Sequence, residues 1–178
     1  MSRFDNRAKE WDQKDRRVNG AKTIAKAIEN KISLTPEMEI LDFGVGTGLL
    51  GFEIAKKVKS IDGVDTSEGM LKKLEEKNTS ELFITPLHQD ILKEPLSKKY
   101  DGVVSSMTLH HVANLNAFFS ELTKIVKDGG FIAIADLEKE NGTFHSDNTG
   151  VHHFGFDEVE LREYVERAGF RDVMIENI

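Results

Sequence analysis

Short apolar runs rich in β-forming residues alternate with stretches of helical spacing along most of this chain. The runs that predict strands span residues 38–43, 61–65, 82–87, 100–107, 131–136 and 170–175. No internal repeat or low-complexity tract interrupts the alternation. This order of elements favours an α/β fold, in which a doubly wound, mainly parallel sheet carries helices on both faces.

Apolar residues at helical spacing predict a helix in each connection. One helix ends before Thr35-Pro36, another covers 67–77, and a strongly amphipathic one begins at Leu115. That helix closes at Asp128-Gly129-Gly130, where glycine can take the left-handed conformation of a cap.

Two segments fall outside this regular pattern. Residues 1–34 form a charged, helical N-terminal stretch, which we expect to act as a lid. Residues 137–155 follow neither a helical nor a strand period. Because loops of this length without structure of their own are usually functional or disordered, we expect a substrate loop there.

The composition excludes several classes of protein. A length of 178 residues fits one domain that spans the whole sequence. The absence of cysteine excludes disulfides and cysteine-based metal sites. The longest apolar run has five residues, 131–135, and the first residues are charged. The sequence therefore predicts neither a membrane span nor a secretory signal, and indicates a soluble, cytoplasmic protein.

The charge is unevenly distributed. Residues 1–31 hold nine Lys/Arg and five Asp/Glu, a net charge of +4. Because the whole chain has a net charge of −7, residues 32–178 carry −11. A body without a basic stripe disfavours nucleic acid as a partner. The N-terminal cations predict a solvated helix face, although an anionic substrate is the alternative.

A glycine-rich turn follows the first predicted strand. Gly44, Gly46 and Gly48 let the backbone curl tightly and approach a ligand, and the next helix directs free N–H groups toward the same place. In an open parallel sheet this is the end at which ligands bind. The turn therefore predicts a site for a flat or negatively charged group.

Two classes of cofactor fit the glycines. Gly46, Gly48 and Gly51 meet the G-x-G-x-x-G pattern of dinucleotide sites, and Asp65 lies 19 residues after Gly46 as a possible ribose ligand. Asp42 favours the other class, because a carboxylate at the end of an apolar strand needs a cationic or donor-rich partner. A pyrophosphate would be repelled there, whereas a methionyl group with its ammonium suits the position.

Residues 42–48 resemble motif I of the class I S-adenosylmethionine-dependent methyltransferases. The segments 63–67, 88–91 and 100–107 agree with the motifs of that family in order and spacing, and 122–135 is typical of its fifth strand and preceding helix. The resemblance implies a Rossmann-like sheet, S-adenosyl-L-methionine as cofactor, S-adenosyl-L-homocysteine as product, and a small molecule as the methyl acceptor.

The resemblance also implies roles for cofactor residues. The glycine loop would hold the methionine part, Asp65 would accept hydrogen bonds from both ribose hydroxyls, and Asp90 would accept one from the adenine amine. The alternative for Asp65 and Asp90 is a helix cap or a turn. The implied cofactor residues are Asp42, Phe43, Gly44, Gly46, Gly48, Asp65, Thr66, Met70, Asp90, Ile91, Ser105, Ser106 and Trp11.

Histidines dominate the predicted acceptor side. His110 and His111 follow the fourth strand, and by family analogy one of them orients the acceptor or takes its proton as a catalytic base. The alternative is a pair satisfied by backbone groups. His145 and His152 are predicted substrate contacts, and no spacing indicates a metal site. Trp11 is expected over the cofactor, with ordinary burial as the alternative.

Alternative functions remain open at this point. A nicotinamide-dependent oxidoreductase lacks a visible Tyr-x-x-x-Lys pair, and a methyltransferase acting on base amino groups lacks an Asn-Pro-Pro-Tyr motif. A non-catalytic binding module would keep the cofactor pocket alone. The family's sheet normally ends in an antiparallel hairpin, and this sequence stops after the first of its strands, so we expect an incomplete sheet with an exposed edge strand at 170–175.

Overall fold

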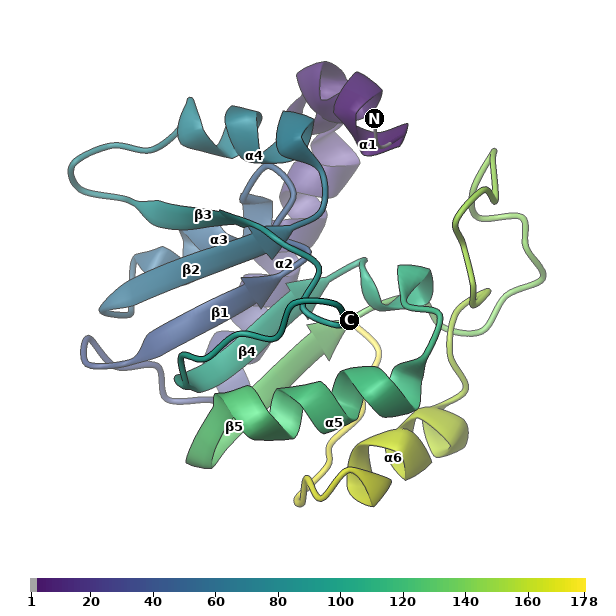
Figure 1. The fold of residues 1–178 in the computed structure, drawn as a ribbon. Coiled ribbons are helices and arrows are strands. Elements are labelled where there is room, and N and C mark those ends of the chain that lie inside the picture. Colours follow the sequence, from purple (N-terminus) through teal and green to yellow (C-terminus); the bar gives the residue numbers. More distant parts are fainter. Residues whose placement is uncertain (1–2) are drawn as a thin grey trace.

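The computed structural model describes residues 3–178 and contains one five-stranded parallel sheet (Figure 1). The strands are β1 Glu39–Phe43, β2 Ser60–Asp65, β3 Ile84–His88, β4 Tyr100–Ser106 and β5 Val126–Ala135. They lie in the order β3-β2-β1-β4-β5, which confirms the predicted α/β class. Strand order reverses between β1 and β4, and ligands of such sheets bind beyond the carboxyl ends at that point.

Helices cover both faces of the sheet (Figure 1). They are α1 Arg3–Arg7, α2 Asp15–Lys31, α3 Leu49–Ala55, α4 Glu68–Glu75, α5 Leu115–Ile125 and α6 Glu158–Arg167, with short 3-10 turns η1 Ala8–Gln13 and η2 Leu109–His111. In Figure 1, α5 and α6 lie in front of the sheet and α2 and α3 behind it. None of the helices within residues 3–178 is both long and apolar enough to cross a membrane.

Neighbouring residues of each central strand are buried against opposite helix layers. In β1, Ile40 packs with residues of α2 and α3, while Leu41 packs with residues of α5. In β4, Val104 and Val103 divide in the same way. All four are completely buried. Burial of such a side chain contributes about 1.5–3 kcal/mol to the free energy of unfolding. The central strands are apolar on both faces because helices cover both faces of the sheet.

The prediction of a last strand at 170–175 is wrong. The structure has no strand there, and β5 has a neighbour on one side only within residues 3–178. Asp172 has φ +55°, which interrupts an extended backbone. Glu176 forms an ion pair with Lys31 at 2.9 Å, so the segment runs toward α2 instead of pairing with β5. β5 is therefore one edge strand of this sheet, and β3 is the other.

Some predicted boundaries also move. The predicted helix 67–77 covers 68–75 and begins directly after Ser67, which is its N-cap. The strand predicted at 131–136 begins earlier, at Val126, and includes Gly129 at φ +77°.

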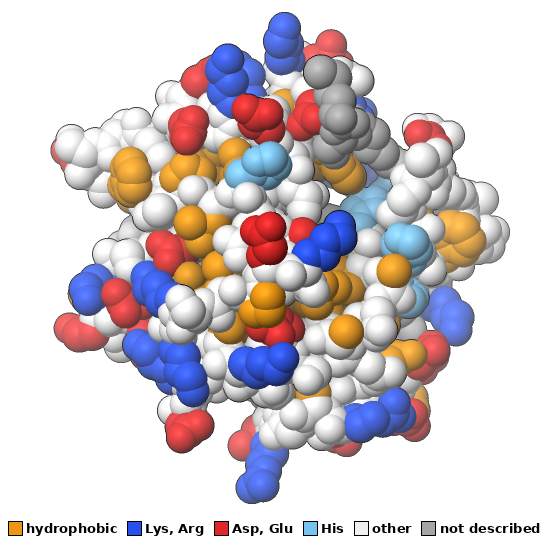
Figure 2. Space-filling model, viewed as in Figure 1, with side chains coloured by type: hydrophobic (Ala, Val, Ile, Leu, Met, Phe, Trp, Pro, Cys, Tyr) orange, Lys and Arg blue, Asp and Glu red, His pale blue; other side chains and the backbone are white. Residues whose placement is uncertain are grey.

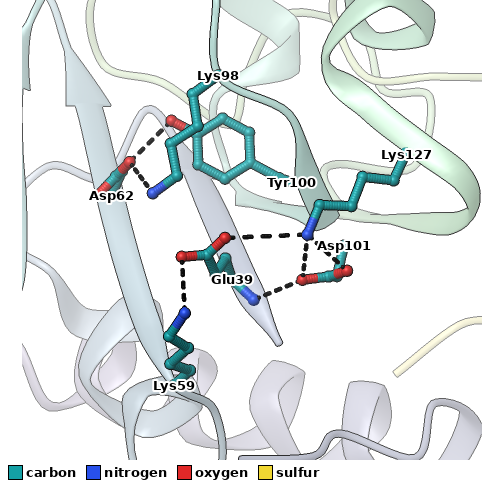
Figure 3. A network of polar contacts seen from close by, with 7 residues as sticks. All are labelled: Glu39, Lys59, Asp62, Lys98, Tyr100, Asp101 and Lys127. Atoms are coloured by element: carbon teal, nitrogen blue, oxygen red, sulfur yellow. Dashed lines mark hydrogen bonds and ion pairs between the residues drawn. The ribbon is translucent and has the colours of Figure 1, made fainter. Parts of the chain in front are cut away.

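A network of polar side chains joins strands near their amino ends (Figure 3). The ammonium of Lys127 donates to both carboxylate oxygens of Asp101 at 2.9 Å, and Asp101 also accepts from the backbone amide of Glu39 at 2.8 Å. The Tyr100 hydroxyl donates to Asp62 at 2.9 Å. Burial, and then this bond, raise the pKa of Tyr100. The network lies opposite the ligand end of the sheet, so it stabilises the fold without lining the site.

Candidate functional site

The loop between β1 and α3 curls through three left-handed glycines. Gly44, Gly46 and Gly48 have φ values of +68°, +55° and +82°, which other residues rarely adopt. A Cβ at Gly44 would lie 2.2 Å from the Thr108 side chain, whereas at Gly46 the nearest atom would be 4.0 Å away. The loop therefore packs against the segment after β4 at one point and leaves its backbone open at Gly46.

Asp42 places an unsatisfied carboxyl oxygen beneath this loop. The residue is 2 % exposed, and its Oδ2 has no hydrogen-bond partner within residues 3–178. Burial, and then the Asp65 carboxylate, raise the pKa of Asp42 to about 8, although the Gly51 amide lowers it. A Cβ at Gly51 would lie 2.8 Å from this oxygen, so glycine is needed there. A positively charged ligand group placed beside this acid would stabilise its ionised form and compensate for its burial.

Asp65 connects the end of β2 with the glycine loop. Its Oδ2 accepts from the Gly46 amide and its Oδ1 from the Ser67 amide, each at 2.8 Å. Burial raises the pKa of Asp65, and these amides lower it. The structure therefore brings two of the predicted cofactor residues, Asp65 and Gly46, into direct contact. The ribose contact of Asp65 stays a prediction.

The residues predicted around adenine differ in their burial and in their contacts. Met70 and Ile91 are 2 % and 1 % exposed, so both are core residues in this structure. Asp90 accepts from the Leu92 amide at 3.1 Å and pairs with Lys93 at 2.9 Å, as a turn residue does. The exposed Thr66 offers its carbonyl to a ring nitrogen of His88 at 3.1 Å. Their contacts with adenine stay predictions.

The end of β4 closes the other side of the loop. The buried Ser105 hydroxyl donates to the Phe43 carbonyl at 2.8 Å, which binds β4 to β1 where the order reverses. The Thr108 hydroxyl donates to the Ser106 carbonyl at 3.1 Å. Between them Met107 has φ +54°, an uncommon value for a side chain of this size. The chain turns sharply here, and His110 follows.

Three of the predicted histidines lie together. The rings of His110 and His111 are 4.1 Å apart, and that of His145 is 4.9 Å from His110. A ring nitrogen of His111 contacts the Gly150 carbonyl at 2.6 Å. The side chain of His152 is exposed, and only its backbone amide reaches this group, at the His110 carbonyl. Figure 2 shows histidine side chains near the 137–155 loop.

His110 also binds an acid that the sequence analysis missed. Its Nδ1 lies 2.7 Å from Oδ1 of Asp136, and the two side chains are 1 % and 3 % exposed. Asp136 directly follows β5, and acids at carboxyl ends of parallel strands meet at one edge. Its position at the end of a predicted strand was the signal in the sequence from which a role in the site could have been predicted.

Hydrogen bonds join the N-terminal segment to the glycine loop and to the residues around α4. Asp12 accepts from the Thr47 hydroxyl at 2.5 Å and from Lys77 at 2.7 Å. Asp5 accepts from the Ser67 hydroxyl at 2.6 Å, directly after Asp65. The first two residues of the predicted lid, Met1 and Ser2, lie outside the described residues. The sequence analysis gave neither acid a role, because an isolated acid in a charged helix carries no signal.

Trp11 lies within this segment, and none of its ring contacts within residues 3–178 is with the glycine loop. The Arg17 guanidinium stacks on its ring at 3.7 Å, and the Phe4 ring lies 5.9 Å away. Phe4 also contacts His111 at 5.2 Å, and Arg16 lies 5.1 Å from the Phe144 ring. These contacts join the N-terminal segment to η2 and to the 137–155 loop.

The chain matches the model of a methyltransferase domain over residues 40–130. That range covers every motif from β1 to the start of β5. The chain belongs to this methyltransferase family. The resemblance to class I S-adenosylmethionine-dependent methyltransferases is thereby confirmed, and the glycine loop lies within the matched residues of this methyltransferase domain. The nicotinamide alternative is no longer supported.

Individual relatives agree with the family. An uncharacterised methyltransferase of Schizosaccharomyces pombe is 35 % identical over 137 residues, which are 67 % of this chain and 48 % of that protein. A malonyl-[acyl-carrier protein] O-methyltransferase of Ilyobacter polytropus is 32 % identical over 57 % of this chain and 40 % of its own length. The solved complex of DhpI with S-adenosylhomocysteine has a TM-score of 0.77 at 18 % identity, covering 93 % of this chain and 83 % of that one. The methyltransferase domain thus spans about half the length of these curated relatives.

The residues of the methyltransferase domain fit its cofactor in two respects. The unpartnered Oδ2 of Asp42 can receive the ammonium of S-adenosylmethionine, and the open backbone at Gly46 leaves space that a side chain would fill. No group of three or more His, Asp or Glu side chains suited to a metal ion occurs within residues 3–178.

Proposed function

We propose that this chain binds S-adenosylmethionine at the glycine loop and transfers its methyl group to a small-molecule acceptor at the histidine cluster. The observation that carries the proposal is the buried Oδ2 of Asp42, which has no hydrogen-bond partner within residues 3–178. It lies beneath the glycine loop, in which the Gly46 amide donates to Asp65. When bound, the cofactor supplies an electrophilic methyl group on a positively charged sulfur. The protein has to hold it, align the acceptor and exclude water.

The glycine loop and Asp42 would hold the methionine part, and Asp65 would turn its carboxylate from the Gly46 amide toward the ribose. Asp90 with Thr66, Met70 and Ile91 would surround adenine, which requires some rearrangement because Met70 and Ile91 are buried. Arg7 and Arg16 of the N-terminal segment would approach the methionine carboxylate.

A small acceptor is favoured by the cover over the site. Phe4 contacts His111, and Arg16 contacts Phe144, so the N-terminal segment and the 137–155 loop meet beside His110. His145 and His152 would contact the acceptor from this loop. The charge of −11 outside the first 31 residues disfavours nucleic acid. A cytoplasmic location stays a prediction.

A pair of glycine variants tests the cofactor site. Gly46→Ala would place a methyl group in the open cradle, while Gly129→Ala introduces a side chain at a similar φ, +77°, with no atom within 4 Å, at the far end of the sheet. Each substitution costs roughly 1–2 kcal/mol of backbone strain. We expect calorimetric titration with S-adenosylhomocysteine to give micromolar affinity in wild type and Gly129→Ala, and at least about tenfold weaker binding in Gly46→Ala.

Three results would contradict the proposal. Wild type that binds NADH and gives no heat with S-adenosylhomocysteine would remove the cofactor assignment. Equal affinity of Gly46→Ala and Gly129→Ala for S-adenosylhomocysteine would show that the ligand lies elsewhere. Binding without methyl transfer to any acceptor class would favour the non-catalytic module.

A further inference from the structure

His110 and Asp136 form a buried pair at the carboxyl ends of β4 and β5. Oδ1 of Asp136 accepts from the Leu137 amide at 2.7 Å, and Oδ2 accepts from the His110 amide at 3.3 Å. A carboxylate that already accepts backbone N–H groups behaves as an acceptor toward the ring as well. The nitrogen facing it at 2.7 Å, Nδ1, therefore carries the proton when the imidazole is neutral.

This arrangement leaves Nε2 of His110 as an unprotonated acceptor. Nε2 is buried and has no hydrogen-bond partner within residues 3–178. A buried acceptor without a donor costs roughly 1–3 kcal/mol, so a site that keeps one is suited to a ligand that supplies the donor. The groups facing the ring are Asp136, His111 and His145.

The position of the pair connects it with methyl transfer. The last residues of β4 and β5, Ser106 and Ala135, are paired in the sheet. Asp136 and the turn that leads to His110 therefore follow directly from paired strand ends. Two residues before His110, Thr108 lies against Gly44 of the cofactor loop. The pair is thus adjacent to the loop and not on a remote surface.

We propose that His110 is the proton acceptor of the reaction, that Asp136 is its positioning residue, and that the methyl acceptor is a hydroxyl or an amine that still carries a proton. The proposal rests on the proposed function, since it concerns the acceptor side of the same site. Carboxylates and thioethers lack the donor that Nε2 requires, so they do not fit.

The step balances without a further reactant. The acceptor oxygen or nitrogen forms a bond to the methyl carbon, the carbon–sulfur bond breaks, and its electron pair remains on sulfur. The acceptor's proton passes to Nε2 of His110, and the Asp136 carboxylate stabilises the resulting imidazolium. Because Nε2 is buried and the His145 ring of the 137–155 loop lies 4.9 Å from the His110 ring, this loop has to shift before the acceptor arrives.

The first test reads the tautomer of His110. Long-range proton–nitrogen NMR spectra of histidine-labelled protein, saturated with S-adenosylhomocysteine in mildly alkaline buffer, distinguish a protonated from an unprotonated ring nitrogen. The His110 signals are those lost in His110→Gln. We expect an unprotonated Nε2 in wild type and in Glu138→Gln, an exposed carboxylate-to-amide control, and mixed tautomers in Asp136→Asn. A proton on Nε2 of the wild type overturns the proposal, whether or not an acceptor is found.

The second test uses radiolabelled S-adenosylmethionine with a panel of phenols, alcohols, amines and matched carboxylates. We expect transfer to hydroxyls or amines, and a fall in kcat of about 100-fold or more in His110→Gln. Asp136→Asn should lower kcat with little change in KM and move the acidic limb of the pH–rate profile to lower pH, because the imidazolium loses its counterion. Added imidazole should restore part of the rate of His110→Ala, which a purely structural role does not predict.

Transfer confined to carboxylates, or a rate unaffected by His110→Gln, overturns the proposal. Calorimetry of the same proteins with S-adenosylhomocysteine separates this failure from that of the proposed function. If wild type does not bind, the proposed function fails. If every variant binds and Nε2 is protonated, only the proton acceptor is refuted.

Discussion

At the scale of single residues, Asp42 links the free energy of unfolding to pH. Burial, and then the Asp65 carboxylate, raise the pKa of Asp42 from 3.8 to about 8. Between these values the folded protein keeps a proton that the unfolded chain has released. The free energy of unfolding therefore falls as pH rises through this range, by up to about 1.4 kcal/mol per pH unit, and the effect ends above about pH 8.

Asp42→Asn should remove this contribution, because an amide cannot ionise. Urea unfolding at several values between pH 5 and 8 should show a smaller decline for Asp42→Asn than for wild type, whereas Asp128→Asn, at an exposed position, should follow wild type. Parallel declines in Asp42→Asn and wild type would contradict a buried, protonated Asp42.

At the scale of elements, the sequence predicted what periodicity and spacing encode. Five of the six predicted strands are present. They could be predicted because helices cover both faces of the sheet, so each strand needs a run of apolar residues. The strand at 170–175 failed because a short apolar run cannot reveal the left-handed Asp172 or the Lys31–Glu176 ion pair. The cofactor motif was readable for the same reason: it is local. The contacts of Asp12 and Asp136 join residues 35 and 26 positions apart, and no local pattern encodes them.

The N-terminal segment should depend on Asp12. Asp12→Asn weakens the bonds to Thr47 and Lys77, and a combined loss of about 1 kcal/mol corresponds to a roughly fivefold larger open population. We expect trypsin to cleave after Lys14 several times faster in Asp12→Asn than in wild type, with global unfolding little changed. Asp15→Asn, where the side chain is exposed, is the control. Equal cleavage rates in all three proteins would mean that Asp12 does not hold this segment.

At the scale of the whole molecule, the two ends of the sheet have different tasks. The polar network of Tyr100, Asp62, Asp101, Lys127 and Glu39 lies near the amino ends of the strands (Figure 3), whereas the glycine loop and η2 follow the carboxyl ends of β1 and β4. Side chains at the amino ends can therefore change the free energy of unfolding while leaving ligand binding intact.

Tyr100→Phe tests this separation. The substitution removes the hydrogen bond to Asp62 and should lower the free energy of unfolding by about 1 kcal/mol, with unchanged affinity for S-adenosylhomocysteine. Tyr164→Phe, on α6, removes a hydroxyl that has no hydrogen bond within residues 3–178, and serves as the matched control. Weaker ligand binding in Tyr100→Phe would show that the two ends are coupled.

Trp11 is the only tryptophan in the chain, and it lies in the segment that Asp5 and Asp12 attach beside the cofactor loop. Its indole stacks against the Arg17 guanidinium, a contact that any displacement of the segment would alter. The tryptophan fluorescence of the protein therefore has a single source in the cover of the site. Stopped-flow mixing with a ligand can follow opening and closing in real time, without an engineered dye.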